Sequence, residues 1–266
     1  MKEIKVGVRE LLETVFLPQD LNAKNQSSSR GTDGTEGHQF LTGKRPEGYR
    51  REVAVKFCHD SGDYRLIVQG RADGLFEESG MLIVEEIKTT YLNLADVVLD
   101  ESGVHAAQLK LYMYFFAENE QLPAAGRLTY LNLDTLEEKS FTVPYSATEC
   151  SGLFERMAEA FLTALRNRDR WVTIRNQSLQ ALEFPFSDRR LGQDELMDLA
   201  ALAIDQERDL IAEAATGIGK TIAVLFPALK RLSAGDRYDQ IFFLTAKTAG
   251  KEIVRKTVAS AMEQGL

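Results

Sequence analysis

The stretch MLIVEEIKTT, residues 81–90, begins as an apolar strand and ends in charged side chains. Four apolar residues in a row are typical of a strand that enters a protein core. Burying the charges of Glu85, Glu86 and Lys88 is costly unless they are solvated, paired with one another or bound to a metal ion. Alternation along a strand places Glu86 and Lys88 on one face and Ile87 on the other. Glu85 is expected on the face opposite Glu86, although a slip of one residue in strand register would exchange the two.

Two further strand patterns precede this stretch, REVAVKFC at 51–58 and YRLIVQGRADGLF at 64–76. Turn residues in HDSGD and EESG separate the three segments, which predicts neighbouring strands of one sheet. The short EESG turn would bring Asp73 alongside Glu86. Metal-dependent hydrolysis of a phosphodiester needs carboxylate ligands for the metal and a cation for the charge that develops. Asp73, Glu86 and Lys88 can supply both.

The rest of the first 171 residues predicts helices and a hairpin around these strands. Residues 4–16 carry apolar side chains near helical spacing, and residues 104–119 predict a helix too apolar to be exposed. Residues 22–37 are polar and predict a loop. The remaining elements are a hairpin at the far edge of the sheet and a closing helix, over residues 127–133, 138–145 and 149–171.

Seven residues in a fixed order carry a resemblance to a known family: Gly34 and His38 in GTEGH, Asp73 in GRADGL, Glu86 and Lys88 in VEEIKTT, and Gln108 and Tyr112 in QLKLY. Over residues 1–165 this order resembles the RecB-like branch of the PD-(D/E)XK nucleases. The resemblance implies an α/β fold with a mixed central sheet flanked by helices. It implies Mg²⁺ or Mn²⁺ held by His38, Asp73 and Glu86. It also implies that Lys88 orients phosphate and water, and that Gln108 and Tyr112 position a DNA strand.

Each part of this pattern alone has a simpler interpretation. An E-x-K sequence at a strand edge is usually a solvated ion pair. His38 alone would fit a loop histidine, and Gln108 with Tyr112 would fit the polar fringe of a core helix. His59 and His105 have no evident partners, so we expect them to be structural or surface residues.

A second motif, EAATGIGKT at residues 213–221, follows a predicted strand at 209–214 and opens a predicted helix at 222–232. Glycines let backbone amides curl around a phosphate, the lysine reaches the terminal phosphates, and the following threonine offers its hydroxyl to Mg²⁺. A second strand, predicted at 240–248, makes this the opening of a parallel α/β sheet. The predicted ATP-binding residues of the loop are Thr216, Gly217, Ile218, Gly219, Lys220 and Thr221.

The segments around this loop narrow the resemblance. Ala214 stands where the general loop has its first glycine, as in the A-x-T-G-x-G-K-T loop of superfamily 2 helicases. Arg190 and Gln193 in FPFSDRRLGQDELM resemble the R-x-x-Q segment of the DinG and XPD helicases, which implies that Gln193 reads adenine. FFLTAKTAGKE looks like their motif Ia, which implies contacts with the DNA backbone from Thr245, Lys247 and Thr248.

Length and composition limit the organisation of the chain. With 266 residues, 44% of them hydrophobic, it can build two modest cores. We predict a RecB-like nuclease domain over 1–170, a linker over 171–187, and an incomplete helicase ATPase domain 1 over 188–266. A net charge of −8 gives no global positive field, so contacts with nucleic acid would be local.

The cysteines and the hydropathy pattern bear on location. Cys58 and Cys150 are far apart and lack metal-ligand spacing, which fits two ordinary thiols in a reducing compartment. No apolar run approaches the roughly 18 residues that span a bilayer, and the N-terminus carries acidic residues. A cytoplasmic protein without a membrane partner is therefore expected.

The sequence thus predicts a DNA repair or processing enzyme, in which a metal-dependent DNA nuclease is joined to the start of a DinG-like helicase that uses ATP. Its expected partner is single-stranded or forked DNA, and the resemblance implies movement from 5′ to 3′. No acidic strand end follows the phosphate loop, so we expect nucleotide binding without turnover. The missing acidic box, the second motor lobe and any iron–sulfur cysteines would lie in a C-terminal part beyond residue 266. The alternatives are a noncatalytic DNA-binding module that keeps the nuclease fold, and a P-loop kinase or transporter ATPase, which the helicase-like segments disfavour.

Overall fold

The computed structural model describes the chain apart from residues 17–30, 120–121, 235–237, 247 and 264–266. The chain divides into two compact units, Met1–Leu165 and Arg166–Leu266. The division falls within one long helix, α4 (Ala147–Ala181). The polar connection predicted after Trp171 is therefore helical as far as Ala181, because the sequence TIRNQSLQA contains no glycine or proline to end the helix.

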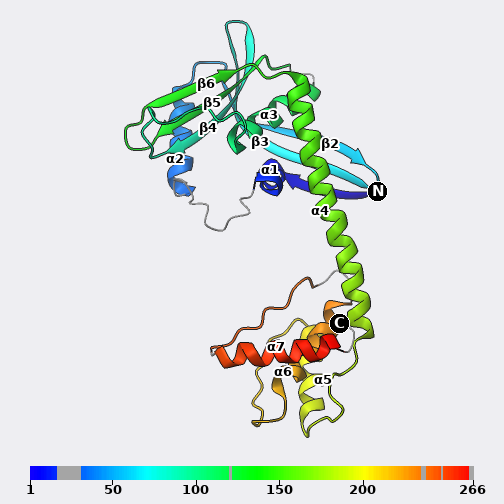
Figure 1. Cartoon of the computed structure of the whole chain (residues 1–266). Helices are drawn as coiled ribbons and strands as arrows, with labels where there is room; N and C mark the ends of the chain where they lie inside the picture. Colours follow the sequence, from blue (N-terminus) through cyan, green and yellow to red (C-terminus); the bar gives the residue numbers. More distant parts are fainter. Residues whose placement is uncertain (17–30, 120–121, 235–237, 247, 264–266) are drawn as a thin grey trace. The chain divides into compact units, whose positions relative to one another are not determined.

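The first unit is built on a six-stranded mixed sheet (Figure 1). Parallel pairing joins β1 to β3 and β4 to β5, and the other neighbours are antiparallel. The sheet confirms the predicted strands around MLIVEEIKTT and the predicted hairpin at the far edge. Five strands follow the order β1 (Lys2–Gly7), β3 (Tyr64–Glu78), β4 (Met81–Thr90), β5 (Ala125–Asn132) and β6 (Glu138–Val143), and β2 (Arg50–Ser61) also pairs with β3.

Strand β3 has three partners, and this arrangement opens the sheet. One edge of β3 pairs with β2, so β1 and β4 must share the other edge. Pairing with β1 ends at Gln69 and pairing with β4 begins at Gly74. Residues 70–73 lie in the interval between those two partners. Asp73 is therefore placed where the sheet forks.

The predicted helix over residues 4–16 was wrong in its first part. Lys2–Gly7 is strand β1, and the helix α1 begins only at Val8 and ends at Phe16. Ile4, Val6 and Val8 also fit the two-residue period of a strand, and parallel pairing with β3 decides between the two periods. The local spacing of apolar residues could not show that partner.

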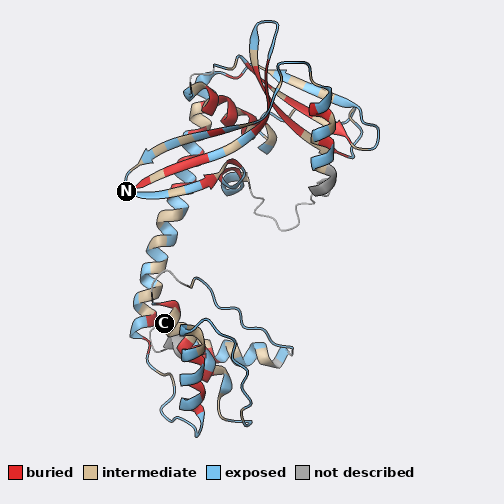
Figure 2. Ribbon diagram, turned by 180° about the vertical axis from the view of Figure 1, so that it is seen from behind, coloured by how far each residue is buried: buried red, intermediate tan, exposed pale blue. Residues whose placement is uncertain are grey.

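Helices cover the two faces of this sheet. Strand residues of opposite parity point to opposite faces, so Val84 and Ile87 of β4 mark the two sides. Val84 belongs to the main core with α1, α3 (Val104–Glu118) and the first part of α4. Ile87 packs instead with Leu41 of α2. Figure 2 shows the buried residues concentrated on the sheet and on the helices that cover it.

Helix α2 (Gly31–Lys44) corrects the predicted loop at 22–37 over the part that the structure describes. Glycine disfavours helix formation, which is why the polar, glycine-containing stretch predicted a loop. Tertiary packing overrides that preference. A Cβ atom at Gly37 would lie 2.7 Å from Thr89 Cγ2 and 2.9 Å from Leu133 Cδ2, so glycine permits the helix to approach the sheet closely.

The second unit contains the helices α5 (Gln193–Asp205), α6 (Lys220–Leu232) and α7 (Thr248–Glu263), and α6 confirms the helix predicted after the glycine loop. The strands predicted at 209–214 and 240–248 were wrong, since the described residues of this unit contain no strand. Parallel strands are stable when they are paired and covered on both faces. Here Ile211 is 99% and Leu244 89% exposed, so neither segment has such cover within the described unit.

Candidate functional site

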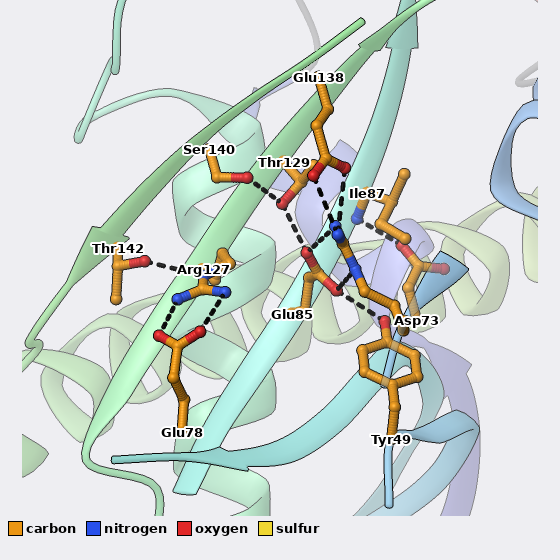
Figure 3. Close-up of polar contacts among 11 residues, drawn as sticks. Tyr49, Asp73, Glu78, Glu85, Ile87, Arg127, Thr129, Glu138, Ser140 and Thr142 are labelled. Carbon is orange, nitrogen blue, oxygen red and sulfur yellow. Dashed lines mark hydrogen bonds and ion pairs between the residues drawn. The ribbon is translucent and has the colours of Figure 1, made fainter. Parts of the chain in front are cut away.

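The site begins at the fork between β3 and β4. Their ladder ends at the pair Gly74 and Glu85, so the next two residues across the fork are Asp73 and Glu86. Asp73 Oδ2 accepts a hydrogen bond of 2.6 Å from the backbone nitrogen of Ile87. The Asp73 carboxylate thus accepts a backbone hydrogen bond from β4, in place of a β3 carbonyl oxygen, just beyond the end of the β3–β4 ladder (Figure 3). The alignment of Asp73 with Glu86 that the EESG turn predicted is present.

Helix α2 brings His38 to Asp73. His38 Nδ1 lies 3.2 Å from Asp73 Oδ1, although the two residues are 35 positions apart in the sequence. Burial alone would lower the pKa of His38, but the hydrogen bond and charge of Asp73 and the charge of Glu86 outweigh it and raise that pKa. The protonated imidazole is therefore favoured beside two carboxylates.

Glu86 is buried, with only 3% of its surface exposed. Its Oε1 accepts a hydrogen bond of 2.7 Å from Lys88 Nζ, whereas its Oε2 is buried without a hydrogen-bond partner among the described residues. Burial raises the pKa of Glu86 to about 7; Lys88 opposes this shift and the charge of Asp73 adds to it. The predicted pairing of Glu86 with Lys88 on one strand face is confirmed. One carboxylate oxygen is left for a further ligand.

Helix α3 supplies the remaining polar residues that the sequence singled out. Gln108 Oε1 accepts a hydrogen bond of 3.0 Å from Lys88 Nζ. Tyr112 lies one turn further along and hydrogen-bonds the Gln108 side chain, while burial raises the pKa of Tyr112 to about 12. Lys88 is thus held between Glu86 and Gln108, and the hydrogen bond with Tyr112 helps to fix the Gln108 side chain.

The expected three-ligand cluster of His38, Asp73 and Glu86 is not preformed. Among the described residues, no three His, Cys, Asp or Glu side chains are placed to hold a metal ion. Asp73 contacts His38, and Glu86 accepts a hydrogen bond from Lys88. Carboxylate oxygens and an imidazole nitrogen are ligands that suit Mg²⁺ or Mn²⁺. The unpartnered Oε2 of buried Glu86 fits such an ion, so the donor set is compatible with one.

A hollow of about 570 Å³ lies beside His38. Strand β2 contributes Arg51 and Glu52 to it, two residues that the sequence patterns did not single out. Glu52 has φ of 51°, and the β2–β3 ladder skips the pair of Glu52 with Asp73. A non-glycine residue in this region of backbone space is uncommon outside functional or strained positions. The full lining is Gly34, Thr35, His38, Gln39, Thr42, Arg51 and Glu52.

Two histidines outside the motif have identifiable surroundings. His105, expected to lack a partner, has its Nδ1 3.0 Å from the hydroxyl of Tyr130. Burial, helped by the charge of Lys88, lowers the pKa of His105 to about 4, so it is neutral at physiological pH. Tyr130 lies opposite Lys88 in the β4–β5 register. His59 packs edge-on against Phe154 and is structural, as expected.

The predicted phosphate loop in the second unit has the expected entry to a helix. Gly217 and Gly219 have φ of 91° and 78°, and α6 begins at Lys220. Lys220 Nζ donates to the carbonyl oxygens of Ala214 and Ala215 at 2.6 and 2.8 Å. The lysine is therefore folded back onto its own loop.

The R-x-x-Q residues lie against the same loop. Arg190 donates a hydrogen bond to the carbonyl oxygen of Gly217, and Gln193 Nε2 lies 3.5 Å from that of Gly219. A hollow of about 450 Å³ adjoins them and is lined partly by Thr221. The structure thus brings together Arg190, Gln193 and the glycine loop, as the sequence order predicted.

The other predicted residues of this unit are less closely gathered. Ile218 packs against the small core of Leu196 and Met197, and Thr216 is exposed. In the predicted motif Ia, Thr245 is exposed, Thr248 is the first residue of α7, and Lys247 lies outside the described residues. Their predicted contacts with DNA stay a prediction.

A mixed sheet flanked by helices, with buried carboxylates and a lysine at its fork, agrees with the predicted PD-(D/E)XK nuclease fold. The comparisons with known proteins agree. The model of the PD-(D/E)XK nuclease superfamily matches residues 8–225, most of the chain, and the protein belongs to that superfamily.

The second unit has a match of its own. The DEAD/DEAH box helicase model matches residues 193–258, which include the phosphate loop. Together the two matches indicate an enzyme that processes nucleic acids, with nuclease and helicase parts. A comparison with curated proteins found no match.

Solved structures also resemble the chain, and 16 of their chains match. One is titled "Crystal structure of SSO0001", with 21% sequence identity, a TM-score of 0.40, and coverage of 58% of this chain and 75% of that chain. None of the helices in the described part of the chain is long and apolar enough to cross a membrane.

Proposed function

We propose that this protein is a RecB-like, metal-dependent DNA nuclease joined to the first part of a DinG-like, ATP-driven helicase motor. The observation that carries the nuclease proposal is the buried, unpartnered Oε2 of Glu86, across the fork from Asp73 and next to Lys88. A buried carboxylate oxygen without a partner is costly in a fold that has no use for it. A divalent cation held by Asp73, Glu86 and His38 would remove that cost.

Each residue of this cluster has a role that follows from its contacts. When bound, Mg²⁺ or Mn²⁺ supplies a Lewis acid and lowers the pKa of a ligated water. Lys88 provides a fixed positive charge for the phosphate, since Glu86 and Gln108 both restrict its ammonium. His38 holds Asp73 in place from α2. Arg51, exposed in the hollow beside His38, offers a second cation to the DNA backbone.

The contacts of Arg190 and Gln193 with the glycine loop support the proposed motor. Both residues touch carbonyl oxygens of the loop, so a bound nucleotide would meet them as well as Lys220. We propose that Gln193 reads the adenine and that Lys220 exchanges the carbonyls of Ala214 and Ala215 for ATP phosphates. Single-stranded or forked DNA is the proposed substrate, delivered to the nuclease by the motor.

Cleavage of a labelled single-stranded DNA with Mn²⁺ tests the nuclease proposal. Lys88→Ala should reduce the rate by roughly 10²- to 10³-fold, since a group that offsets developing charge is worth about that much. Lys5→Ala is the matched control, because Lys5 is an exposed lysine on strand β1. It should cleave at the wild-type rate.

Calorimetric titration with Mn²⁺ separates the nuclease from the noncatalytic module. A nuclease should bind Mn²⁺, and Asp73→Asn with Glu86→Gln should abolish that binding. Wild-type protein that binds DNA but neither binds Mn²⁺ nor cleaves would establish the noncatalytic DNA-binding module instead.

A further inference from the structure

A second buried carboxylate lies beside the candidate site but on the opposite face of β4. Glu85 is 0% exposed, and all its partners are side chains from other elements (Figure 3). Arg45 donates to it from Nε at 3.1 Å and from Nη2 at 2.7 Å. Tyr49 donates at 2.7 Å and Thr129 at 2.6 Å. Unlike Glu86, Glu85 is therefore fully satisfied.

Two of the three partners of Glu85, Arg45 and Tyr49, come from the segment that follows α2. Arg45 comes directly after the helix, and its third contact, from Nη1, reaches Glu138 of β6 at 3.1 Å. Tyr49 packs over Gly74 so closely that a Cβ atom there would lie 1.9 Å from the tyrosine hydroxyl. Because Gly74 has no side chain, the Tyr49 hydroxyl can occupy this space and donate its hydrogen bond to Glu85.

Helix α2 and the residue after it make three successive contacts with the sheet. His38 and Leu41 lie three residues apart on one face of α2, and Arg45 directly follows the last helical residue, Lys44. His38 contacts Asp73, Leu41 packs with Ile87, and Arg45 binds Glu85. The apolar contact of Leu41 with Ile87 has no preferred direction, so it would allow the helix to slide. The bidentate hydrogen bonds from Arg45 to Glu85 instead fix the position and angle of the chain at the end of the helix.

A buried ion pair of this kind is a poor source of stability compared with apolar packing, because both charges must leave water. Its geometric specificity is the better account of its presence. If the helix shifted along the sheet, His38 would leave Asp73, and a displacement of about 1 Å can cost roughly 10² in catalytic rate.

We propose that Glu85, with Arg45 and Tyr49, forms a positioning clamp that fixes helix α2 on the sheet and thereby holds His38 against Asp73. This inference rests on the proposed nuclease function. None of the three residues belongs to the proposed ligand set of His38, Asp73 and Glu86, and they act through His38.

A double-mutant cycle tests the clamp, with Mn²⁺-dependent cleavage of single-stranded DNA as the readout. Arg45→Met should lower the rate by roughly 10- to 100-fold in the wild-type background and by less than twofold in a His38→Ala background. Tyr49→Phe, which removes one hydrogen bond, should do the same more weakly and keeps the fold if Arg45→Met does not. Arg45→Lys, which keeps the charge, should restore part of the rate.

The matched control is Arg127→Met. Arg127 also pairs with a carboxylate of this sheet, Glu78, and donates a further hydrogen bond to Thr142 of β6 (Figure 3). It should leave the rate within twofold of the wild type. Equal losses from Arg45→Met or Tyr49→Phe with and without His38 would overturn the clamp, since a general loss of structure does not depend on the histidine.

Failure of the nuclease proposal can be told apart from failure of the clamp. If the wild-type protein neither binds Mn²⁺ nor cleaves, the proposed function fails, and the clamp is then tested by amide hydrogen exchange over residues 38–44. These amides should lose protection in Arg45→Met or Tyr49→Phe and keep it in Arg127→Met. Unchanged protection in the clamp variants would overturn the inference.

Discussion

Replacing Glu86 by glutamine should make the metal-free protein more stable, although it removes a side chain on which the proposed activity depends. Glutamine has the shape of a protonated glutamate and carries no charge. The wild-type carboxylate is buried, and its Oε2 has no hydrogen-bond partner among the described residues. The substitution therefore removes the cost of ionising this group inside the fold.

The size and the pH dependence of the effect follow from the pKa of Glu86. Burial raises that pKa from 4.5 to about 7, against the attraction of Lys88. Between these pH values the folded state binds more protons than the unfolded state, so the free energy of unfolding of the wild type falls as pH rises. The full difference corresponds to about 3 kcal/mol. Glu86→Gln should match the wild type to within about 1 kcal/mol near pH 4.5 and exceed it by about 3 kcal/mol at pH 8.

Urea unfolding followed by circular dichroism, at both pH values and with EDTA, measures this difference. Adding Mn²⁺ at pH 8 supplies a second comparison. At 100 times its dissociation constant the ion should stabilise the wild type by about 2.7 kcal/mol and leave Glu86→Gln unchanged. The advantage of the variant should then nearly disappear.

Two results would refute this reasoning. One is a Glu86→Gln protein that is less stable than the wild type at pH 8 without metal, and the other is an advantage of the same size at both pH values. Glu85→Gln is the control, because Glu85 is equally buried but is bound by Arg45, Tyr49 and Thr129. Breaking that buried pair should destabilise the protein by about 3–5 kcal/mol at pH 8.

Three other outcomes are expected. Gly37→Ala should destabilise the fold by about 1–3 kcal/mol in thermal unfolding and slow cleavage, because its Cβ would lie 2.7 Å from Thr89 Cγ2. Gly43→Ala in the same helix meets nothing within 4 Å and should be neutral or stabilising. The affinity for Mn²⁺ should increase at least tenfold with each unit of rising pH up to about 7, since Glu86 and protonated His38 must each lose a proton to bind the ion; a flat titration from pH 5.5 to 7 would contradict this. Lys220→Ala should abolish ATP binding in calorimetry and leave Mn²⁺ binding unchanged.

The strand part of the site could be predicted because it is local. Alternation alone places Glu86 and Lys88 on one face, and a short turn brings Asp73 opposite Glu86. The structure has both features. Gln108 and Tyr112, four residues apart in the sequence, likewise lie together on one face of α3, as their spacing predicted.

The clamp around Glu85 could not be predicted, because its members have no periodic relation. Arg45 lies 40 residues from Glu85, and Thr129 lies 44 residues from it on the other side. Only the order of strands in the sheet brings them together. Strand alternation correctly predicted that Glu85 faces away from Glu86, but it could not predict which side chains Glu85 contacts on that face.

Other errors came from preferences that tertiary contacts overrule. The glycines before His38 predicted a loop, but close packing on β4 made them helical. Apolar runs after Arg208 predicted strands, yet a strand needs a neighbouring backbone, and the described second unit provides none.

The hydrogen bonds of Lys220 to its own loop would limit the affinity of the proposed nucleotide site. Its ammonium donates to two carbonyl oxygens of the loop, so the phosphate of the proposed nucleotide would compete with the protein's own backbone. In the proposed motor, ATP would bind productively only to the fraction of molecules in which this side chain has left the backbone carbonyls, and the dissociation constant would rise as that fraction falls. A substitution elsewhere that loosened the lysine would tighten nucleotide binding without touching the nucleotide.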